Sequence, residues 1–206
     1  GFKYEIRGII NQLQMLNKRI LTSATQGVEI PDFVQLKEPR IINYLKGKRT
    51  SQLTFKTVVS PTKSKLKTVL ELIQHIGNEP GIIFCNLKDS ITQLSTFLER
   101  NKISHACFSG GMEQKDRERA LIKFRNGTCQ LLIATDLAAR GIDIVEMKYI
   151  IHYELPNHEE EFIHRNGRTA RVNEKGTAYI LKWENERLPE FIKVSKGINI
   201  SKKAHY

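Results

Sequence analysis

Short apolar runs alternate with longer amphipathic stretches along most of this chain, and this alternation limits the possible folds more than any other feature of the sequence. Residues 82–85 and 131–134 are apolar at every position. Such runs are typical of strands that are buried on both faces of a parallel sheet. The sequence therefore predicts strands at 19–22, 53–59, 81–85, 105–108, 130–135, 149–153 and 176–181.

The stretches between these runs carry apolar residues at helical spacing. In the stretch 63–76, for example, Leu66, Val69, Leu70 and Ile73 fall on one helix face. The same pattern predicts helices at 4–16, 63–76, 90–100, 114–124, 159–166 and 186–194. Strands that alternate with helices of this length predict an α/β fold, with an open, mostly parallel sheet and helices on both faces.

The first 52 residues fit this alternation poorly. A single helix and a single strand precede Pro31, and the segment 31–49 is irregular and basic. We expect residues 1–30 to be the end of a preceding domain, 31–52 to be a linker, and 53–206 to form one complete domain.

The composition is that of an ordinary folded protein, with 40% hydrophobic and 27% charged residues in 206, which excludes disorder and a small disulfide scaffold. No apolar run approaches the ~20 residues of a membrane-spanning helix, and the first residues do not resemble a secretory signal. The three cysteines are far apart in the sequence, at positions 85, 107 and 129. We expect reduced thiols, a cytoplasmic location and no membrane partner.

Basic residues exceed acidic ones by 33 to 22, and the formal net charge is +11. No acid stands between Glu38 and Glu71, although eight Lys and Arg residues do. This excess favours a polyanionic partner such as nucleic acid. The alternative is a solvated basic loop that only aids solubility.

The segment 134–143, Ala-Thr-Asp-Leu-Ala-Ala-Arg-Gly-Ile-Asp, directly follows a predicted buried strand. Ligands of open α/β sheets bind at the carboxyl ends of strands, so Thr135, Gly141 and Asp143 are candidate site residues. The alternative is an ordinary strand-to-helix turn with capping residues.

The segment 164–171, His-Arg-Asn-Gly-Arg-Thr-Ala-Arg, holds three arginines and a histidine. Arg168 and Arg171 would share one helix face, and paired guanidinium groups suit phosphate oxygens. The alternative is a solvated basic helix end. Two weaker segments are 109–117, with a double glycine before a helix, and 22–25, a predicted strand end rich in hydroxyl groups.

Some common sites are absent from the sequence. It has no GxxxxGK[ST] phosphate loop, no paired-acid magnesium motif and no Cys/His spacing typical of zinc. We therefore expect no metal ligands in this chain.

In their order along the chain, these segments resemble the motifs of the DEAD-box RNA helicases of superfamily 2. The matching segments are 23–25 (motif III), 83–86 (motif IV), Gln114 and Arg117 (the Gln-x-x-Arg element), 134–143 (motif V) and 164–171 (motif VI). Three positions depart from the family pattern: Asn166 replaces an apolar residue, Ala170 replaces glycine, and Ser109 replaces a frequent histidine.

The resemblance implies a RecA-like fold of the P-loop NTPase type for residues 53–206, with residues 1–30 as the last helix and strand of a first RecA-like domain. It implies that γ-phosphate is reached by Arg168 and Arg171, and that the ribose of ATP is bound by Asp143 near Gly141. It implies that the two domains are linked by Ser23, Thr25 and His164. It implies that the RNA backbone is contacted by Asn86, Gly111, Gln114, Arg117 and Thr135.

By the same resemblance, the chain is the C-terminal part of an enzyme that couples ATP hydrolysis to RNA unwinding or RNP remodelling. Its partners would be RNA and the first RecA-like domain of the same parent chain, and its cofactor would be ATP with Mg2+ held by that first domain. We expect the chain alone to be unable to hydrolyse ATP. The alternatives are a non-catalytic RNA-binding or scaffold module, and a DNA helicase or remodeller of the same superfamily.

Overall fold

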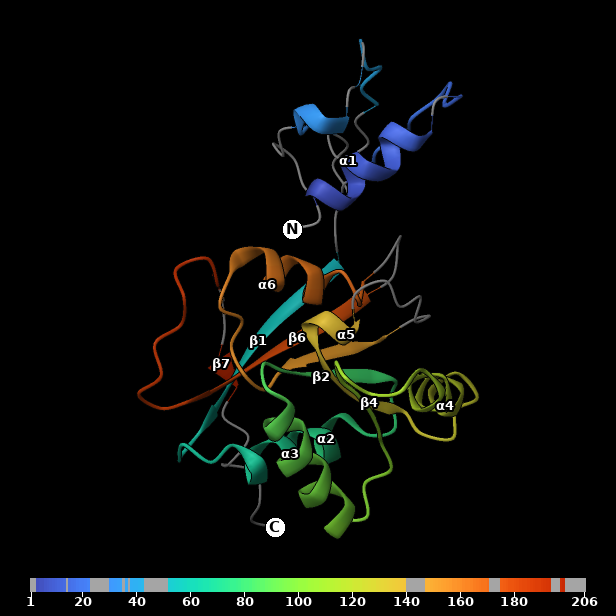
Figure 1. Cartoon of the computed structure of the whole chain (residues 1–206). Coiled ribbons are helices and arrows are strands. Elements are labelled where there is room, and N and C mark those ends of the chain that lie inside the picture. The colour runs from blue at the N-terminus through green and yellow to red at the C-terminus, as the bar shows by residue number, and fades with distance from the viewer. Residues whose placement is uncertain are drawn as a thin grey trace, which may run out of the picture. The chain divides into compact units, whose positions relative to one another are not determined.

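The chain divides into two compact units, Gly1–Thr50 and Ser51–Tyr206 (Figure 1). A computed structural model describes residues 3–13, 15–22, 30–34, 36, 38–42, 52–139, 147–170, 175–193 and 197–198. The boundary lies close to the predicted start of the complete domain at residue 53, although the predicted split of the first 52 residues remains a prediction.

The first unit contains helix α1 (Lys3–Gln12) and the 3-10 turn η1 (Asp32–Val34). The strand predicted at 19–22 is wrong, because the described residues there have no regular structure. A strand needs a neighbour to pair its N–H and C=O groups, and the described part of this unit offers none. Helix α1 ends four residues earlier than predicted, and none of its residues is buried.

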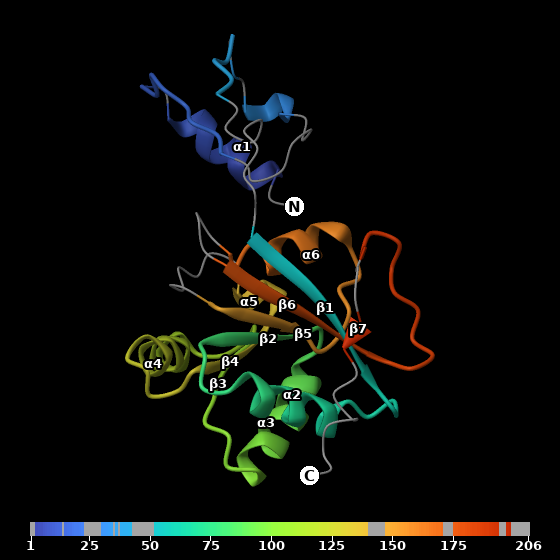
Figure 2. The same ribbon diagram turned by 180° about the vertical axis from the view of Figure 1, so that it is seen from behind.

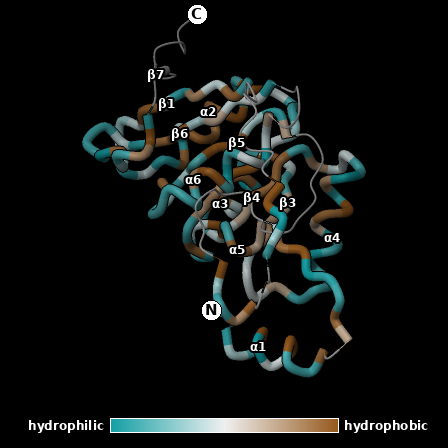
Figure 3. The backbone as a smooth tube through the Cα atoms, turned by 90° about the horizontal axis from the view of Figure 1, so that it is seen from above, coloured by the Kyte–Doolittle hydropathy of each residue, from teal (hydrophilic) through white to brown (hydrophobic). Residues whose placement is uncertain are grey.

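The second unit is built on a parallel sheet, as predicted. Its described strands are β1 (Gln52–Ser60), β2 (Gly81–Cys85), β3 (Ala106–Phe108), β4 (Leu131–Thr135), β5 (Tyr149–His152), β6 (Lys175–Trp183) and β7 (Gly197–Ile198). Their order across the sheet is β3-β4-β2-β5-β6-β1-β7, and every pair is parallel. Hydrophobic residues run along the central strands (Figure 3), because these strands are covered on both faces.

Helices cover both faces of this sheet, as Figures 1 and 2 show. They are α2 (Leu66–Ile76), α3 (Lys88–Arg100), α4 (Gln114–Arg125), α5 (Asp136–Ala139) and α6 (Glu159–Asn166). Leu72 and Leu94 of α2 and α3 pack in one core cluster with Ile83. Ala120 of α4 packs in another with Ile82. Neighbouring residues of a strand thus pack into the cores on opposite faces of the sheet, because successive side chains of a strand point to opposite faces.

The helix predicted at 186–194 is wrong, since residues 186–193 form irregular structure and turns. Pro189 falls inside the predicted helix, where it would remove a backbone hydrogen bond and clash with the preceding turn. The apolar pattern instead reflects a loop whose Ile192 packs against Phe162 and Ile180. None of the described helices is long and apolar enough to cross a bilayer.

Candidate functional site

The described parts of three predicted site segments, 83–86, 109–117 and 134–143, meet at the carboxyl edge of three neighbouring strands. Cys85 of β2 is in register with Thr135 of β4, and Phe108 of β3 is in register with Ala134 of β4. The residues that follow these strands therefore lie next to one another, as ligand sites of open α/β sheets require. Asn86, Thr135 and the glycine pair before α4 are brought together in this way.

The turn into α4 forms an exposed part of this edge. Gly111 has a φ of +82°, a left-handed conformation that glycine adopts without steric cost. Gln114 begins α4 and donates a hydrogen bond to Glu118 (2.9 Å). Arg117, one turn later, places its guanidinium carbon 5.0 Å from the ring centre of Phe108. A cation is thereby held over the end of β3 by a cation–π contact.

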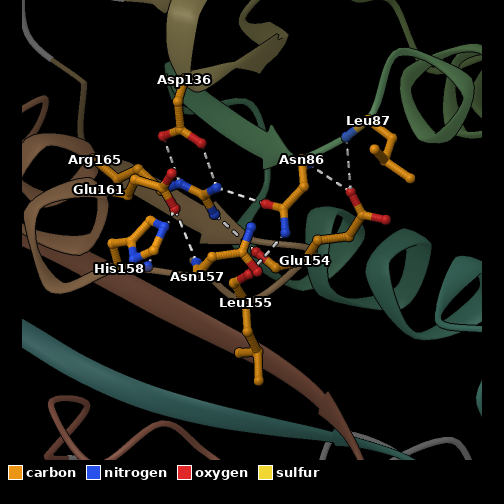
Figure 4. A network of polar contacts seen from close by, with 9 residues as sticks. All are labelled: Asn86, Leu87, Asp136, Glu154, Leu155, Asn157, His158, Glu161 and Arg165. Atoms are coloured by element: carbon orange, nitrogen blue, oxygen red, sulfur yellow. Dashed lines mark hydrogen bonds and ion pairs between the residues drawn. The ribbon is translucent and has the colours of Figure 1, made fainter.

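The centre of the edge is occupied by Arg165, which the sequence did not single out (Figure 4). Its side chain is fully buried and makes a bidentate ion pair with Asp136, at 2.8 Å from Nε and 2.5 Å from Nη2. The guanidinium also donates to the carbonyl of Glu154 (2.8 Å) and to Oδ1 of Asn86 (2.7 Å). Its carbon lies 5.2 Å from the ring centre of Phe84. Such pairing makes a buried charge tolerable.

The side chain of Asn86 is engaged at both ends. Its Oδ1 accepts from Arg165, and its Nδ2 donates to the carbonyl of Leu155 (2.9 Å). The resemblance implied that this residue contacts RNA, whereas the structure gives its side chain two partners inside the protein. The amide keeps a second lone pair on Oδ1 and a second N–H on Nδ2, so these two bonds leave room for another ligand, and the RNA contact of Asn86 remains a prediction.

Two further predicted residues lie on α6 or just after it. His164 and Arg168 line a small cavity together with Asp136 and Ala139. The Nδ1 atom of His164 is buried and has no hydrogen-bond partner. Arg168 is half-buried and lies in the turn two residues beyond the last residue of α6. The other predicted residues of this group, namely Ser23, Thr25, Gly141, Asp143 and Arg171, lie outside the described residues.

Asn166, one of the departures from the family pattern, is explained by a buried partner. Its Oδ1 lies 3.1 Å from Nε2 of His152, and both side chains are buried. Burial, with the nearby charge of Arg165, lowers the pKa of His152 to about 3, so this imidazole is neutral at pH 7. The hydrogen-bonded pair of Asn166 and His152 thus stands where the family pattern has an apolar residue.

Ala170, a second departure, adopts the left-handed backbone conformation that glycine favours. Its φ is +51°. The neighbouring Thr169 hydroxyl donates to the carbonyl of Met147 (2.5 Å), and this bond fixes the segment in place. The surrounding contacts therefore hold a backbone strain that glycine would not have.

The described residues contain no group of three or more His, Cys, Asp or Glu side chains that could hold a metal ion. All three cysteines are free thiols. Burial raises the pKa of Cys85 well above its ordinary value, so this thiol is not a ready nucleophile.

Comparison with known proteins gives one family and a consistent set of relatives. The model of the family described as helicase conserved C-terminal domain matches residues 64–173. The chain is 32% identical over 191 residues to eukaryotic initiation factor 4A of Drosophila melanogaster, which covers 91% of this chain and 47% of that protein. It is 38% identical over 134 residues to a probable ATP-dependent RNA helicase, DDX4, of Sus scrofa, covering 64% of this chain and 19% of that protein. The chain thus spans half or less of these curated relatives.

Solved structures with the same fold include the E. coli DEAD-box protein SrmB bound to the regulator of ribonuclease activity A. It is 26% identical, with a TM-score of 0.63, over 70% of this chain and 89% of that chain. S. cerevisiae Dbp5 bound to RNA and ADP BeF3 is 22% identical, with a TM-score of 0.64, over 73% of this chain and 42% of that chain. The second likeness is one of fold alone.

Proposed function

Since this chain belongs to the helicase conserved C-terminal domain family, in its DEAD-box branch, we propose that it is the second RecA-like half of an ATP-dependent RNA helicase. The observation that carries the proposal is the meeting of the described parts of segments 83–86, 109–117 and 134–143 at one edge of the sheet. Residues 53–206 would form this half, 31–52 a linker, and 1–30 the end of the ATP-binding half.

The three free thiols support a reducing compartment such as the cytoplasm.

RNA would lie along the exposed part of the edge. Gly111 can bring its backbone N–H close to a phosphate, and Arg117 supplies a cation fixed over Phe108. Gln114 and Thr135 add polar groups beside them. Contacts of this kind are made to the sugar-phosphate backbone, so we expect binding that depends strongly on salt and little on sequence.

ATP would be bound between the two halves, with the phosphates near the end of α6. Arg168 and Arg171 would stabilise the charge that develops as the γ-phosphoryl group is transferred, in the manner of arginine fingers. Asp143 and Gly141 would face the ribose, and His164 would contact the ATP-binding half when the two close. Mg2+ bound with ATP neutralises phosphate charge, and we assign its ligands to the ATP-binding half.

In this mechanism the chain's own residues bind, orient and stabilise charge, and they do not activate water. Closure of the two halves on ATP and RNA would bend one RNA strand and separate a short duplex. Hydrolysis would then allow the halves to open. The chain alone, without a phosphate-loop lysine, is expected to be inactive as an ATPase.

Reconstitution tests this proposal. The 206-residue chain is mixed with a separately produced ATP-binding half of a DEAD-box helicase, and ATP hydrolysis is measured with and without single-stranded RNA. We expect RNA-stimulated hydrolysis from the mixture, and its loss with Arg168→Ala or Arg171→Ala. Arg187→Ala, a change to an exposed arginine in the loop after β6, is the matched control and should retain activity.

Other outcomes would separate the alternatives. Hydrolysis by the chain alone would contradict the proposal. RNA binding without hydrolysis in the mixture would identify a non-catalytic RNA-binding module. Equal stimulation by DNA would indicate a helicase or remodeller that does not read the 2′-hydroxyl group.

A further inference from the structure

Glu154, which follows β5, anchors the start of α3 from a distant part of the chain. One carboxylate oxygen accepts from the backbone N–H of Asn86 (2.5 Å) and of Leu87 (3.4 Å). The other accepts from the hydroxyl of Ser90 (2.6 Å). The residue at the N-cap position, Leu87, has no side-chain oxygen to offer. Glu154 therefore accepts the N–H hydrogen bonds that an N-cap side chain would accept, and its negative charge is stabilised at the positive end of the helix dipole.

The same residue is joined to α6 through its main chain. The carbonyl of Glu154 accepts from Nη1 of Arg165, while Nη2 of that arginine donates to both Asn86 and Asp136. Asn86, Asp136 and Glu154 follow the three adjacent strands β2, β4 and β5. One buried guanidinium thus holds the ends of three neighbouring strands in a fixed arrangement (Figure 4).

This arrangement joins two places to which the proposed function gives different ligands. The turn at Asn86 belongs to the edge proposed to face RNA. Helix α6 carries His164, proposed to face the other half, and is followed by Arg168, proposed to face ATP, whose backbone N–H donates to the carbonyl of Arg165 (3.1 Å). A displacement of the turn must break the hydrogen bond between Asn86 and Arg165 or move α6 with it. Because packed elements respond by discrete shifts rather than by continuous deformation, such a link can transmit a change between two sites.

Resting on the proposed function, we propose that Glu154 and Arg165 are positioning residues that couple the RNA-facing turn to α6 and to Arg168 just beyond it, with Asn86 as the link between them. None of the three touches the reacting phosphate in this assignment. Their effect is to hold Arg168 where it can reach the phosphate when RNA is bound. A misplacement by about 1 Å of a group that aligns the reaction can cost on the order of a hundredfold in rate.

The test separates a positioning role from RNA binding by a split between kcat and the RNA concentration at half-maximal rate. Glu154→Gln keeps the shape of the side chain and loses its charge and one acceptor. In the reconstituted ATPase we expect it to lower kcat at saturating RNA by about tenfold or more. Arg117→Ala, which removes a proposed direct RNA contact, should raise the RNA concentration at half-maximal rate and leave kcat at saturating RNA within about twofold.

The matched control is Glu186→Gln. Glu186 is also a half-buried carboxylate, and it accepts a hydrogen bond from the backbone N–H of Trp183 (3.0 Å). Its carboxylate is paired with Lys65, and no hydrogen bond among the described residues joins it to Arg165. We expect its kcat to equal that of the unmodified chain. An equal loss in both variants would show that only general stability was measured and would overturn the proposal.

Two further measurements keep the proposal falsifiable. Amide hydrogen exchange of Asn86 and Leu87, measured on the chain alone, should accelerate in Glu154→Gln. The double variant Glu154→Gln with Arg165→Lys should lower kcat little more than the stronger single variant, because both break one network. If the losses in kcat of the two single variants added up in the double variant, or if the amide exchange of Asn86 and Leu87 did not change, the proposed coupling would be overturned.

The inference and the proposed function fail in different ways. No ATPase from the mixture containing the unmodified chain would overturn both. RNA-stimulated ATPase whose kcat is unchanged by Glu154→Gln would leave the proposed function intact and overturn only the positioning role.

Discussion

Residues 1–50 and residues 51–206 differ in how far their apolar side chains are buried. In α1, Ile6, Ile9 and nearby Leu13 are 41%, 59% and 48% exposed, although they recur at helical spacing. In β4, Leu132 and Ile133 are fully buried, each facing a different core cluster. Both segments would be predicted as regular elements from their sequence alone.

The difference shows that periodicity specifies an element but not its burial. Strands β1 to β6 pair with one another and are covered by helices of the same unit, so this unit completes its own core. The described part of the first unit has one helix and one 3-10 turn, and no buried residue in either. The second unit also buries the charge of Arg165, which is tolerated because Asp136 and other hydrogen-bond acceptors surround the guanidinium.

The largest expected effect comes from that buried charge. Arg165→Ala leaves the carboxylate of Asp136, 19% exposed, without its partner, and we expect the free energy of unfolding to fall by about 3–5 kcal/mol. Urea unfolding monitored by circular dichroism measures this loss. Arg187→Ala, at an exposed position, should change it by less than about 0.5 kcal/mol. Similar values for both variants would mean that the buried ion pair adds no stability to the second unit.

A matched pair of apolar truncations tests the contrast directly. Leu132→Ala removes a fully buried side chain from β4 and should cost about 3 kcal/mol of unfolding free energy. Ile9→Ala in α1 should cost less than about 0.5 kcal/mol, since its side chain is 59% exposed. A loss above ~2 kcal/mol for Ile9→Ala would mean that α1 has a core of its own.

Buried neutral histidine makes the second unit sensitive to acid. The pKa of His152 is about 3 in the folded chain, below its ordinary value of 6.5, so the unfolded chain binds the proton more readily. Stability is therefore fully present above pH ~6.5 and is lost as the pH falls toward ~3, by about 2 kcal/mol between pH 7.5 and pH 5. Urea unfolding at the two pH values should show this difference, and His152→Asn should reduce it by that amount. An equal pH dependence in the variant would contradict the assignment.

The smallest expected effect concerns backbone strain, which occurs in both units. Ala170→Gly should raise the free energy of unfolding by up to about 1 kcal/mol, because its φ of +51° is unfavourable for alanine. Glu38 in the first unit has a φ of +44°, but Glu38→Gly should leave the main unfolding transition within about 0.3 kcal/mol, because that unit buries little. Equal stabilisation by both would show that the two units unfold together.

The parallel sheet could be predicted because apolar runs such as 82–85 and 131–134 have no polar face to place in water. The two wrong elements have local causes. The segment 186–194 has an apolar helical pattern interrupted by Pro189, and 19–22 has a strand pattern without a neighbouring strand among the described residues.

The site was predicted in part. Gly111, Thr135 and Arg117 stand where strand ends and a helix start can be read from the sequence. Arg165 was missed because, within a segment of three arginines, burial depends on what surrounds each one. Its partners Asn86, Asp136 and Glu154 come from three strand ends up to 79 positions away from it, and only the order of the strands brings them together.

The strand order has a consequence for synthesis of the chain. β1 is the first strand of its unit to leave the ribosome, yet it pairs along its whole length with β6, about 120 residues later in the sequence. At typical elongation rates β1 must wait on the order of ten seconds for that partner. Until then its apolar residues and unpaired backbone are exposed to other nascent chains. Chaperone demand should therefore peak while the middle of the unit is being translated, and should end only once β6 has emerged.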